Sequence, residues 1–455
     1  MKITRTTAII LAGGIGVRMK TMTPKQFLRI SGKPVLVHTL AHFVNNEAIS
    51  DIVVVCPKEY LDDVKEIIGE YKIGKVRKIV CGGRTRQESS FNGLKACPRG
   101  TEYVLMHDAV RPFVDKKIID DTLNAAKEVG ASDTVIDTAD TIIVQKGHLI
   151  DNIPDRTNLK RGQTPQGFRY KDLIEAHKWA IKKGITNSTD DCRLVLTMGK
   201  RVKVVPGSVY NIKLTDQTDL YLAERLFQLK SDEIEVLNYG ALRGKVAIVV
   251  GGSGGIGREI VALFKKFGCC VIAVSKSTPI KCDITEEESI RQCFDQVMVK
   301  HKRIDIVVNS AGVLKISEIE KMRISEWDET VKINLSGAFK LSKAFIAICR
   351  KTNKGGHIVH LGSSSYTRGR AGYAAYSASK AGLVNFCQAL ADEVLKYGIY
   401  VNVVSPQRVA TEMRTKGFGP EKGALLLSPA EVAHTVVKAC MIKETGQVFD
   451  VRTQK

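Results

Sequence analysis

Short runs of apolar and β-branched residues alternate with longer helix-like segments along the whole chain. The runs are continuously apolar, which indicates strands that are buried on both faces. Strands of this kind, separated by helices, are typical of parallel sheets with helices packed on both sides. The pattern therefore predicts an α/β fold with strands at 6–11, 51–55, 102–107, 245–250, 270–274, 304–309 and 356–361.

This pattern starts twice, each time with a strand that runs into a glycine-rich turn. The first turn follows TTAIIL at 6–11, and the second follows KVAIVV at 245–250. A charged, helix-like stretch separates the two halves, and 455 residues exceed the size at which a single hydrophobic core stops growing. We therefore expect two α/β domains, 1–235 and 236–455, with the boundary in the region 228–243.

Composition narrows the possible functions. No apolar stretch is long enough to span a membrane, and the apolar run near the start meets a glycine cluster, so it predicts a strand and not a signal peptide. The formal charge is +21, without a basic tail that would indicate a nucleic-acid arm or a membrane anchor. Two interpretations of this charge stay open: a solvated basic surface, or substrates that carry phosphate. The 11 cysteines show no paired spacing, which favours a reducing compartment and a cytoplasmic protein.

The first glycine-rich turn offers backbone N–H groups to an anion. Glycines allow a phosphate to approach the backbone closely, and two cations, Arg18 and Lys25, follow the turn. An ordinary strand-to-helix turn would look the same, and the spacing is not that of a P-loop. The candidate anion-binding residues are Ala12, Gly13, Gly14 and Gly16.

Further motifs follow this turn in a fixed order: PKQF at 24–27, GGRTRQES at 82–89, HDAVRP at 107–112, DRTNLKRGQTPQGF at 155–168, TDD at 189–191 and NIKLT at 211–215. Together they resemble the cytidylyltransferases that join CTP to a sugar or polyol phosphate, of the methylerythritol-phosphate and ribitol-phosphate types. The resemblance covers about residues 5–230 and implies a Rossmann-like nucleotidyltransferase. One departure is visible: this chain has Leu11-Ala12-Gly13-Gly14 where the family usually has Ala-Ala-Gly; this change is mild and leaves the phosphate loop possible.

The resemblance implies a role for each matching residue. Arg18, Lys25 and Lys213 would stabilise the charge that gathers as pyrophosphate leaves, and Asp108 would bind Mg²⁺. The cytidine would lie against Gly82, Gly83 and Ser89, and the polyol phosphate against Arg111, Thr141, Arg156 and Thr164. Arg156 would act across a dimer, because the family projects this segment into its partner.

Simpler interpretations of the same residues remain open. Asp108 could cap a turn, and Lys213 could be a surface lysine. His107 is interpreted as a buried, hydrogen-bonded histidine and not as a metal ligand, and Arg86 could serve only to brace the cytidine loop.

The second glycine-rich turn has the spacing GxxxGxG and opens a helix, where the helix dipole favours a pyrophosphate. VNSAG at 308–312, GSSS at 362–365 and YSASK at 376–380 follow it. These motifs resemble the short-chain dehydrogenase/reductases across about residues 243–455, which implies a doubly wound Rossmann domain. The implied cofactor-binding residues are Gly251, Gly255, Ile256, Gly257, Asn309, Ala311, Gly312 and Thr411.

The catalytic residues of this half would be Ser363, Tyr376, Lys380 and Asn334. Tyr376 would protonate a carbonyl oxygen that Ser363 also hydrogen-bonds, and we expect the Lys380 ammonium to lower the pKa of Tyr376. Lys380 would also contact the nicotinamide ribose, and Asn334 would complete a proton relay through a water molecule. An ordinary helix face can show the same YxxxK spacing, so the argument depends on the accompanying motifs.

The end of the second strand indicates the cofactor. NAD enzymes place a carboxylate there, whereas this chain has Ser275 and Lys276, which favours the 2′-phosphate of NADPH. Asp283 matches the residue that caps the adenine. Departures at Val250, Ser310 and Gln407 put the nicotinamide side and substrate recognition in doubt. Four arginines are expected in loops near the opening of the substrate pocket: Arg368, Arg370, Arg408 and Arg414. Either one or two of them bind a substrate phosphate, or all four are ordinary surface charges.

The whole chain resembles bifunctional enzymes that fuse a ribulose-5-phosphate reductase to a CDP-ribitol pyrophosphorylase in bacterial capsule synthesis. The resemblance implies NADPH, Mg²⁺, CTP and a sugar or polyol phosphate as small-molecule partners, a homodimer or higher homo-oligomer, and neither nucleic acid nor membrane. Three alternatives remain: a methylerythritol-phosphate cytidylyltransferase fused to a different reductase, a scaffold in which one domain only promotes dimerisation, and a nucleic-acid binder.

Overall fold

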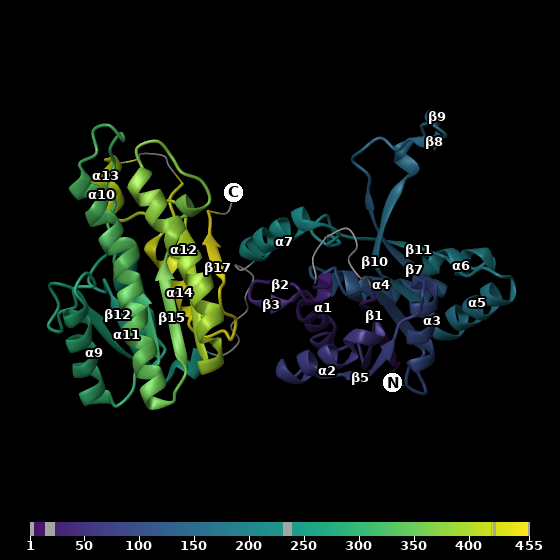
Figure 1. Cartoon of the computed structure of the whole chain (residues 1–455), viewed down its shortest axis with the longest axis horizontal. Coiled ribbons are helices and arrows are strands. Elements are labelled where there is room, and N and C mark those ends of the chain that lie inside the picture. The colour runs from purple at the N-terminus through teal and green to yellow at the C-terminus, as the bar shows by residue number, and fades with distance from the viewer. Residues whose placement is uncertain (1–3, 14–22, 231–238, 420, 422–424, 454–455) are drawn as a thin grey trace. The chain divides into compact units, whose positions relative to one another are not determined.

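The computed structural model describes residues 4–13, 23–230, 239–419, 421 and 425–453. The chain divides into two compact units, Met1–Glu224 and Arg225–Lys455 (Figure 1). The boundary predicted at 235 falls in the segment 231–238, outside the described residues, and stays a prediction.

The first unit contains a seven-stranded sheet among the described residues, in the order β11-β7-β10-β6-β1-β4-β5. Its strands are β1 (Thr6–Leu11), β4 (Asp51–Cys56), β5 (Val76–Cys81), β6 (Tyr103–Asp108), β7 (Ala131–Asp137), β10 (Lys160–Arg169) and β11 (Lys203–Pro206). Its helices are α1 (Val35–Val44), α2 (Leu61–Glu70), α3 (Arg86–Ala96), α4 (Lys116–Val129), α5 (Tyr170–Lys182) and α6 (Asp191–Thr197); α7 (Gln217–Lys230) follows. Two short ribbons complete it, β2 (Arg29–Ile30) with β3 (Lys33–Pro34) and β8 (Val144–Lys146) with β9 (Leu149–Asn152).

The prediction of buried α/β strands is confirmed, but the first sheet is not entirely parallel. Strand β10 runs antiparallel to both β6 and β7. After β7 the chain extends outward into the β8–β9 ribbon and returns directly beside β7, without the helical crossover that a parallel neighbour requires. Figure 1 shows β8 and β9 at the tip of this arm, away from the sheet of their own unit.

The second unit contains a six-stranded parallel sheet in the described residues, in the order β13-β12-β14-β15-β16-β17. The strands are β12 (Val246–Val250), β13 (Cys270–Val274), β14 (Ile306–Asn309), β15 (Gly356–Leu361), β16 (Ile399–Pro406) and β17 (Val448–Val451). The helices are α8 (Gly255–Lys266), α9 (Glu287–His301), α10 (Ile324–Val331), α11 (Gly337–Thr352), α12 (Ala374–Val394), α13 (Glu412–Phe418) and α14 (Pro429–Ala439), with a π-helical turn at Lys332–Ser336 between α10 and α11.

Alternate residues of the central strands enter separate cores, which explains their continuous hydrophobicity. In β12, Ile248 and Val250 pack into the core on one face of the sheet, and Ala247 and Val249 into the core on the other. Strand β1 divides in the same way, with Ile10 in one core and Ile9 in the other. A polar residue at any of these positions would be buried without a partner, so the pattern specifies a sheet covered on both faces.

Each sheet has a point where the strand order reverses. In the first unit the chain moves from β1 outward to β4 and β5, then returns to β6 on the other side of β1. In the second it moves from β12 to β13 and returns to β14. Ligands of open α/β sheets bind beyond the carboxyl ends of the strands at such points. The candidate residues of both halves follow these strand ends.

Candidate functional sites

Asp108 is the centre of a charged cluster at the carboxyl end of β6. Its Oδ2 atom lies 2.9 Å from Lys213 Nζ and 3.5 Å from Arg111 Nε. Asp108 and Arg111 are buried, whereas the Lys213 side chain is half-exposed. The structure thus brings together three predicted residues from two separate motifs, HDAVRP and NIKLT, at the reversal point of the sheet.

The charges of this cluster keep Asp108 ionised. Burial by itself would raise the pKa of the Asp108 carboxyl, but the positive charges of Lys213, Arg111 and Arg86 outweigh it and lower the pKa to about 2. An ionised carboxylate is a suitable ligand for a hard metal ion, and the two cations beside it attract phosphates.

Hydrogen bonds from β10 hold the cluster in place. Thr164 Oγ1 accepts a hydrogen bond from the Asp108 backbone N–H at 3.1 Å and contacts His107 Nδ1 at 3.0 Å. The other ring nitrogen of His107 lies 3.2 Å from the Arg111 carbonyl oxygen, and burial lowers the pKa of His107 to about 3. His107 is therefore a buried neutral histidine with both nitrogens in contact, as interpreted from the sequence. Arg111 Nη1 donates to the carbonyl of Asn211 at 2.8 Å, which ties in the segment that carries Lys213.

The glycines predicted to read cytidine converge on one hydroxyl. Ser89 Oγ accepts a hydrogen bond from the Gly83 N–H at 3.0 Å. A Cβ atom built on Gly82 would lie 3.1 Å from this oxygen, and one on Gly13 would lie 3.7 Å from it. The loops after β1 and β5 therefore approach each other around Ser89. A side chain at Gly13 or Gly82 would narrow the space between these loops and the Ser89 hydroxyl. Nearby, the Ala12 carbonyl accepts from Gln26 Nε2 at 2.9 Å, and Lys25 Nζ donates to the Thr215 carbonyl.

In the second unit, the turn after β12 is closely packed. Gly251 has a φ of +76°, and a Cβ on it would lie 2.8 Å from the Ala311 backbone nitrogen. A Cβ on Gly257 would lie 2.2 Å from the Gly251 carbonyl oxygen. Gly254 caps the N-terminus of α8 and has nothing within 4 Å of the Cβ position, which leaves open space at the helix start. A glycine-lined opening at the N-terminus of a long helix fits a cofactor pyrophosphate; Gly255 and Ile256 begin this helix.

The end of β13 carries a cation, as predicted. Lys276 Nζ lies 2.8 Å from Asp283 Oδ2 and is largely exposed. Asp283 also accepts two hydrogen bonds from Thr285, through its N–H and its hydroxyl. The Ser275 hydroxyl lies 3.2 Å from that of Ser277. The predicted adenosine-binding residues Ser275, Lys276 and Asp283 are thus close together in one loop region.

The loop after β14 is tied to the π-helical turn. Asn334 is buried in this turn; its Oδ1 accepts from the Val313 N–H at 2.9 Å, and its Nδ2 donates to the Val313 carbonyl at 3.0 Å and to Ser379 Oγ at 3.1 Å. Asn309 Oδ1 accepts from the Ala311 N–H at 3.2 Å. A Cβ on Gly312 would lie 3.2 Å from Asn334 Oδ1. Asn334 therefore connects the strand end to helix α12.

Ser363, Tyr376, Lys380 and Thr411 line one cavity of about 130 Å³ beyond the carboxyl ends of β15 and β16. Tyr376 and Lys380 lie one turn apart on α12, and Lys380 Nζ is 5.8 Å from the centre of the Tyr376 ring. This Nζ donates to the Leu361 carbonyl at 2.7 Å. Arg370, Arg408 and Arg414 line the cavity too; Arg368 does not.

The expected direction of the Tyr376 pKa is wrong for this structure. Burial raises the pKa of Tyr376 above its ordinary value, against a hydrogen bond with Ser363 and the charge of Arg414. Burial also lowers the pKa of Lys380 to about 8, so the ammonium is itself destabilised in this site. Tyr376 is therefore a protonated acid at neutral pH here, which suits proton donation.

Comparisons with known proteins agree with this division. The family model "2-C-methyl-D-erythritol 4-phosphate cytidylyltransferase" matches residues 6–229, and "short chain dehydrogenase" matches 245–421. The first half is 42% identical to a 2-C-methyl-D-erythritol 4-phosphate cytidylyltransferase of Clostridium botulinum, over 49% of this chain and 98% of that protein. It is 36% identical to a ribitol-5-phosphate cytidylyltransferase of Streptococcus agalactiae, over 50% of this chain and 96% of that protein.

One relative matches both halves together. The bifunctional ribulose 5-phosphate reductase/CDP-ribitol pyrophosphorylase Bcs1 of Haemophilus influenzae is 36% identical over 97% of this chain and 95% of its own length. The chain belongs to this bifunctional family. It is an enzyme with a cytidylyltransferase domain and a short-chain dehydrogenase domain, as the motifs predicted.

Some predicted residues of this bifunctional enzyme are not gathered at the Asp108 cluster. Thr141 and Arg156 are exposed and lie in the segments just before β8 and just after β9; Arg156 Nη1 donates to the Ala139 carbonyl at 3.0 Å. Gly14, Gly16 and Arg18 lie outside the described residues. No helix in the described parts of the chain is long and apolar enough to cross a membrane, and no cluster of three or more metal-ligating side chains occurs in them.

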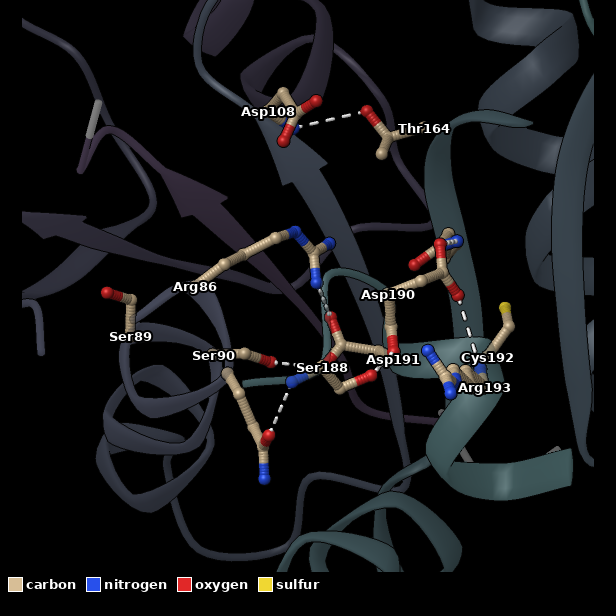
Figure 2. A network of polar contacts seen from close by, with 12 residues as sticks. Arg86, Ser89, Ser90, Asp108, Thr164, Ser188, Asp190, Asp191, Cys192 and Arg193 are labelled. Atoms are coloured by element: carbon tan, nitrogen blue, oxygen red, sulfur yellow. Dashed lines mark hydrogen bonds and ion pairs between the residues drawn. The ribbon is translucent and has the colours of Figure 1, made fainter. Parts of the chain in front are cut away.

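A second polar network in the cytidylyltransferase domain was not predicted in this form. Arg86 Nη1, at the start of α3, lies 2.7 Å from Asp191 Oδ2, at the start of α6 (Figure 2). The buried Asp191 Oδ1 also accepts from Ser90 Oγ at 2.8 Å and lies 3.0 Å from His177 Nε2. Burial raises the pKa of Asp191, but Arg86, His177 and Ser90 lower it to about 2. The motifs GGRTRQES and TDD contained the signal, but sequence spacing could not show that they meet.

Replacing Asp191 with Asn is expected to lower the free energy of unfolding by about 3 kcal/mol, because the partly buried Arg86 loses its counter-charge. The pKa of Asp191 is lower in the folded state than in the unfolded state. Its contribution to the free energy of unfolding is therefore fully present above its ordinary pKa of 3.8 and is lost as the pH falls toward 2. Denaturant unfolding of both proteins from pH 7 downward checks this; the difference in stability should begin to shrink near the ordinary pKa of 3.8 and close only toward pH 2. The control, Asp62→Asn, removes a fully exposed pair with Lys65 and should change nothing. Equal effects of the two substitutions would contradict the prediction.

Proposed function

We propose that this enzyme reduces D-ribulose 5-phosphate to D-ribitol 5-phosphate with NADPH and then joins the product to CTP, giving CDP-ribitol and pyrophosphate for surface polysaccharide synthesis. The observation that carries the proposal is the likeness over nearly the full length to a protein named for both activities. The two charged sites described above support it, because each offers cations to phosphate-bearing substrates. The domain boundary near 235 belongs to the same proposal.

In the reductase half, Tyr376 donates a proton to the carbonyl oxygen, and Ser363 hydrogen-bonds the same oxygen. A bound nicotinamide would supply the hydride to the carbonyl carbon. Lys380, held by the Leu361 carbonyl, faces the Tyr376 ring, and we propose that it binds the nicotinamide ribose. Asn334 positions the loop after β14 against α12 through its three hydrogen bonds.

In the cytidylyltransferase half, a phosphate oxygen of the polyol phosphate forms a bond to the α-phosphorus of CTP as the bond to pyrophosphate breaks. Negative charge gathers on the oxygens around that phosphorus, so catalysis depends on fixed cations. Lys213 and Arg111 are held by Asp108, and Lys25 by the Thr215 carbonyl. We propose that Lys213, Lys25 and Arg18 stabilise this charge, and that Arg111, Thr164, Thr141 and Arg156 receive the polyol phosphate.

Asp108 fits a magnesium ion. Mg²⁺ commonly takes one or two protein carboxylates and completes its octahedron with water and substrate phosphates. Asp108 is ionised and lies at the carboxyl end of β6, so it would hold the ion. A bound Mg²⁺ would neutralise charge on the triphosphate. Gly82, Gly83 and Ser89 form the adjoining surface for cytidine, with Ala12, Gly13, Gly14 and Gly16 at the phosphates.

One incubation tests the whole proposal. Ribulose 5-phosphate, NADPH, CTP and Mg²⁺ should together yield CDP-ribitol, identified by mass, with release of pyrophosphate. The second candidate is a cytidylyltransferase that acts on 2-C-methyl-D-erythritol 4-phosphate, favoured by the 42% identity to such an enzyme. Pyrophosphate release with methylerythritol phosphate but not with ribitol 5-phosphate would establish this alternative and overturn the first.

The preference for NADPH is proposed from Lys276. Replacing Lys276 with Ala should lower kcat/KM for NADPH by about 10- to 100-fold and leave that for NADH unchanged, because only NADPH carries the 2′-phosphate that this cation would bind. Steady-state kinetics with both cofactors measures the effect. Lys281→Ala, a neighbouring exposed lysine, is the matched control. A wild-type preference for NADH would exclude the proposal.

A homodimer or higher homo-oligomer is proposed from the arm. The large apolar side chains exposed on it are Ile142, Ile143, Val144, Leu149, Ile150 and Ile153. A concentration of exposed apolar side chains on one segment favours a protein interface there. Sedimentation as a monomer at micromolar concentration would contradict this oligomer.

The 11 cysteines are all free, which supports a cytoplasmic location.

A further inference from the structure

The reductase cavity has a charged lining of a single sign. Among the described residues that line it, the ionisable side chains other than tyrosines are Arg370, Lys380, Arg408 and Arg414, and no carboxylate is included. Lys380 is accounted for by its place beside Tyr376 and the Leu361 carbonyl. The three arginines have no role in proton or hydride transfer. Glu421, outside the lining, pairs with Arg414, but the lining keeps an excess of positive charge. Such a pocket attracts an anion.

The arginines surround a second tyrosine of the cavity, Tyr373. This ring lies edge-on to Tyr376, with centroids 6.2 Å apart, and stacks on Phe418 of α13 at 5.7 Å. Burial and the charge of Glu421 raise the pKa of Tyr373, and the nearby charges of Arg414, Arg370 and Arg408 oppose this shift. Tyr373 therefore connects the reacting end of the cavity, at Tyr376, with the arginine cluster.

The three guanidinium groups are held to different degrees. Arg414 makes a two-pronged ion pair with Glu421, at 2.6 and 2.9 Å, and lies 4.5 Å from the Phe418 ring centre. This pair uses its Nε and Nη2 atoms, so Nη1 remains to donate. Arg370 makes one long contact, 3.4 Å from Nη2 to Ser364 Oγ, and the Arg408 side chain is exposed. Arg370 and Arg408 therefore keep most of their donors for a ligand.

We propose that Arg370 and Arg408, together with Arg414 as oriented by Glu421, bind the phosphate group of the reductase substrate beside Tyr373. This rests on the proposed function and adds to it the residues that select a phosphorylated ketose. Arginine forks match the oxygens of a phosphate through paired N–H donors. Only a short carbon chain separates the carbonyl of a pentulose phosphate from its phosphate, which agrees with both groups being held in one cavity. Arg368, outside the lining, takes no part.

The test compares an Arg370→Met/Arg408→Met double variant with Arg368→Met, which removes a neighbouring exposed charge. With ribulose 5-phosphate, the double variant should lose about 10²- to 10³-fold in kcat/KM, mainly through KM, and Arg368→Met should stay within about twofold. Inorganic phosphate should inhibit the wild type in competition with the ketose phosphate and inhibit the double variant far less. Arg408→Lys, which keeps a charge but not the fork, should fall between them.

CTP-dependent pyrophosphate release in the same polypeptide shows that each variant is folded in its other half, and thermal unfolding shows whether the reductase half is intact. If the wild type reduces ribulose 5-phosphate and the double variant keeps its kcat/KM and its inhibition by phosphate, the arginine site is overturned. If the wild type reduces no ketose phosphate, the proposed function fails. In that case the arginine site is tested with any ketone that the enzyme does reduce with NADPH: if inorganic phosphate does not compete with this ketone, the site is overturned as well.

Discussion

Replacing Tyr376 with Phe is expected to lower kcat for ketose-phosphate reduction by about 10²- to 10⁴-fold, the usual contribution of a positioned general acid. The change removes one hydroxyl and keeps the ring that contacts Tyr373 and lines the cavity. KM should therefore change little, because the substrate contacts remain. Oxidation of NADPH followed at 340 nm measures the rate.

Two controls make this result specific. Tyr373→Phe removes a hydroxyl from the neighbouring ring, which has no assigned part in proton transfer, and should cost far less in kcat. CTP-dependent pyrophosphate release by Tyr376→Phe should equal that of the wild type, because Tyr376 belongs to the other catalytic domain. A Tyr376→Phe enzyme that kept a tenth or more of its kcat would remove Tyr376 from the role of proton donor.

Replacing Lys213 with Ala should lower kcat for CDP-ribitol formation by about 10²- to 10³-fold, comparable to the loss of one preorganised donor at a developing negative charge. Lys213→Arg should recover part of this activity, because it keeps the cation near Asp108. The matched control is Lys203→Ala, which removes a surface lysine of β11 that is paired with Glu128 of α4. The reductase rate should not change in any of these variants.

The same variant has a second, independent readout. Lys213 is the strongest of the charges that lower the pKa of Asp108 against the effect of burial. Its removal should raise that pKa in the metal-free protein, which a titration of the Asp108 carboxyl in the wild type and in Lys213→Ala would measure. Activity within a few-fold of wild type with an unshifted pKa of Asp108 would show that Lys213 is a surface lysine, the simpler interpretation that its sequence allowed.

The central strands and the reductase motifs were predictable because their signals are local. A continuously apolar run must have both faces covered, and the alternation of Ile9 and Ile10 between two cores is its direct result. The YSASK spacing places Tyr376 and Lys380 on one helix face by geometry alone. In both cases the pattern of a few neighbouring residues was enough for the prediction.

What could not be predicted depends on contacts between distant segments. The antiparallel course of β10 follows from the arm, whose residues carry no strand-direction signal. The direction of the Tyr376 pKa depends on how deeply the ring is buried, which spacing does not contain. Likewise, Arg86 and Asp191 are far apart in sequence, so their pairing required the fold. Of the four arginines treated as equivalent in the sequence, only Arg368 lies outside the cavity lining.

The π-helical turn at Lys332–Ser336 can be understood as one extra residue accommodated in an otherwise continuous helix that runs through α10 and α11. Each residue of an α-helix advances the side-chain direction by about 100°. Loss of one residue from this turn would therefore leave a regular helix but rotate α10 relative to α11 by that angle and withdraw Asn334 from Val313 and Ser379. Chain length at this point, and not only residue identity, is thus a determinant of the reductase site, so that a deletion could inactivate it while every motif residue was retained.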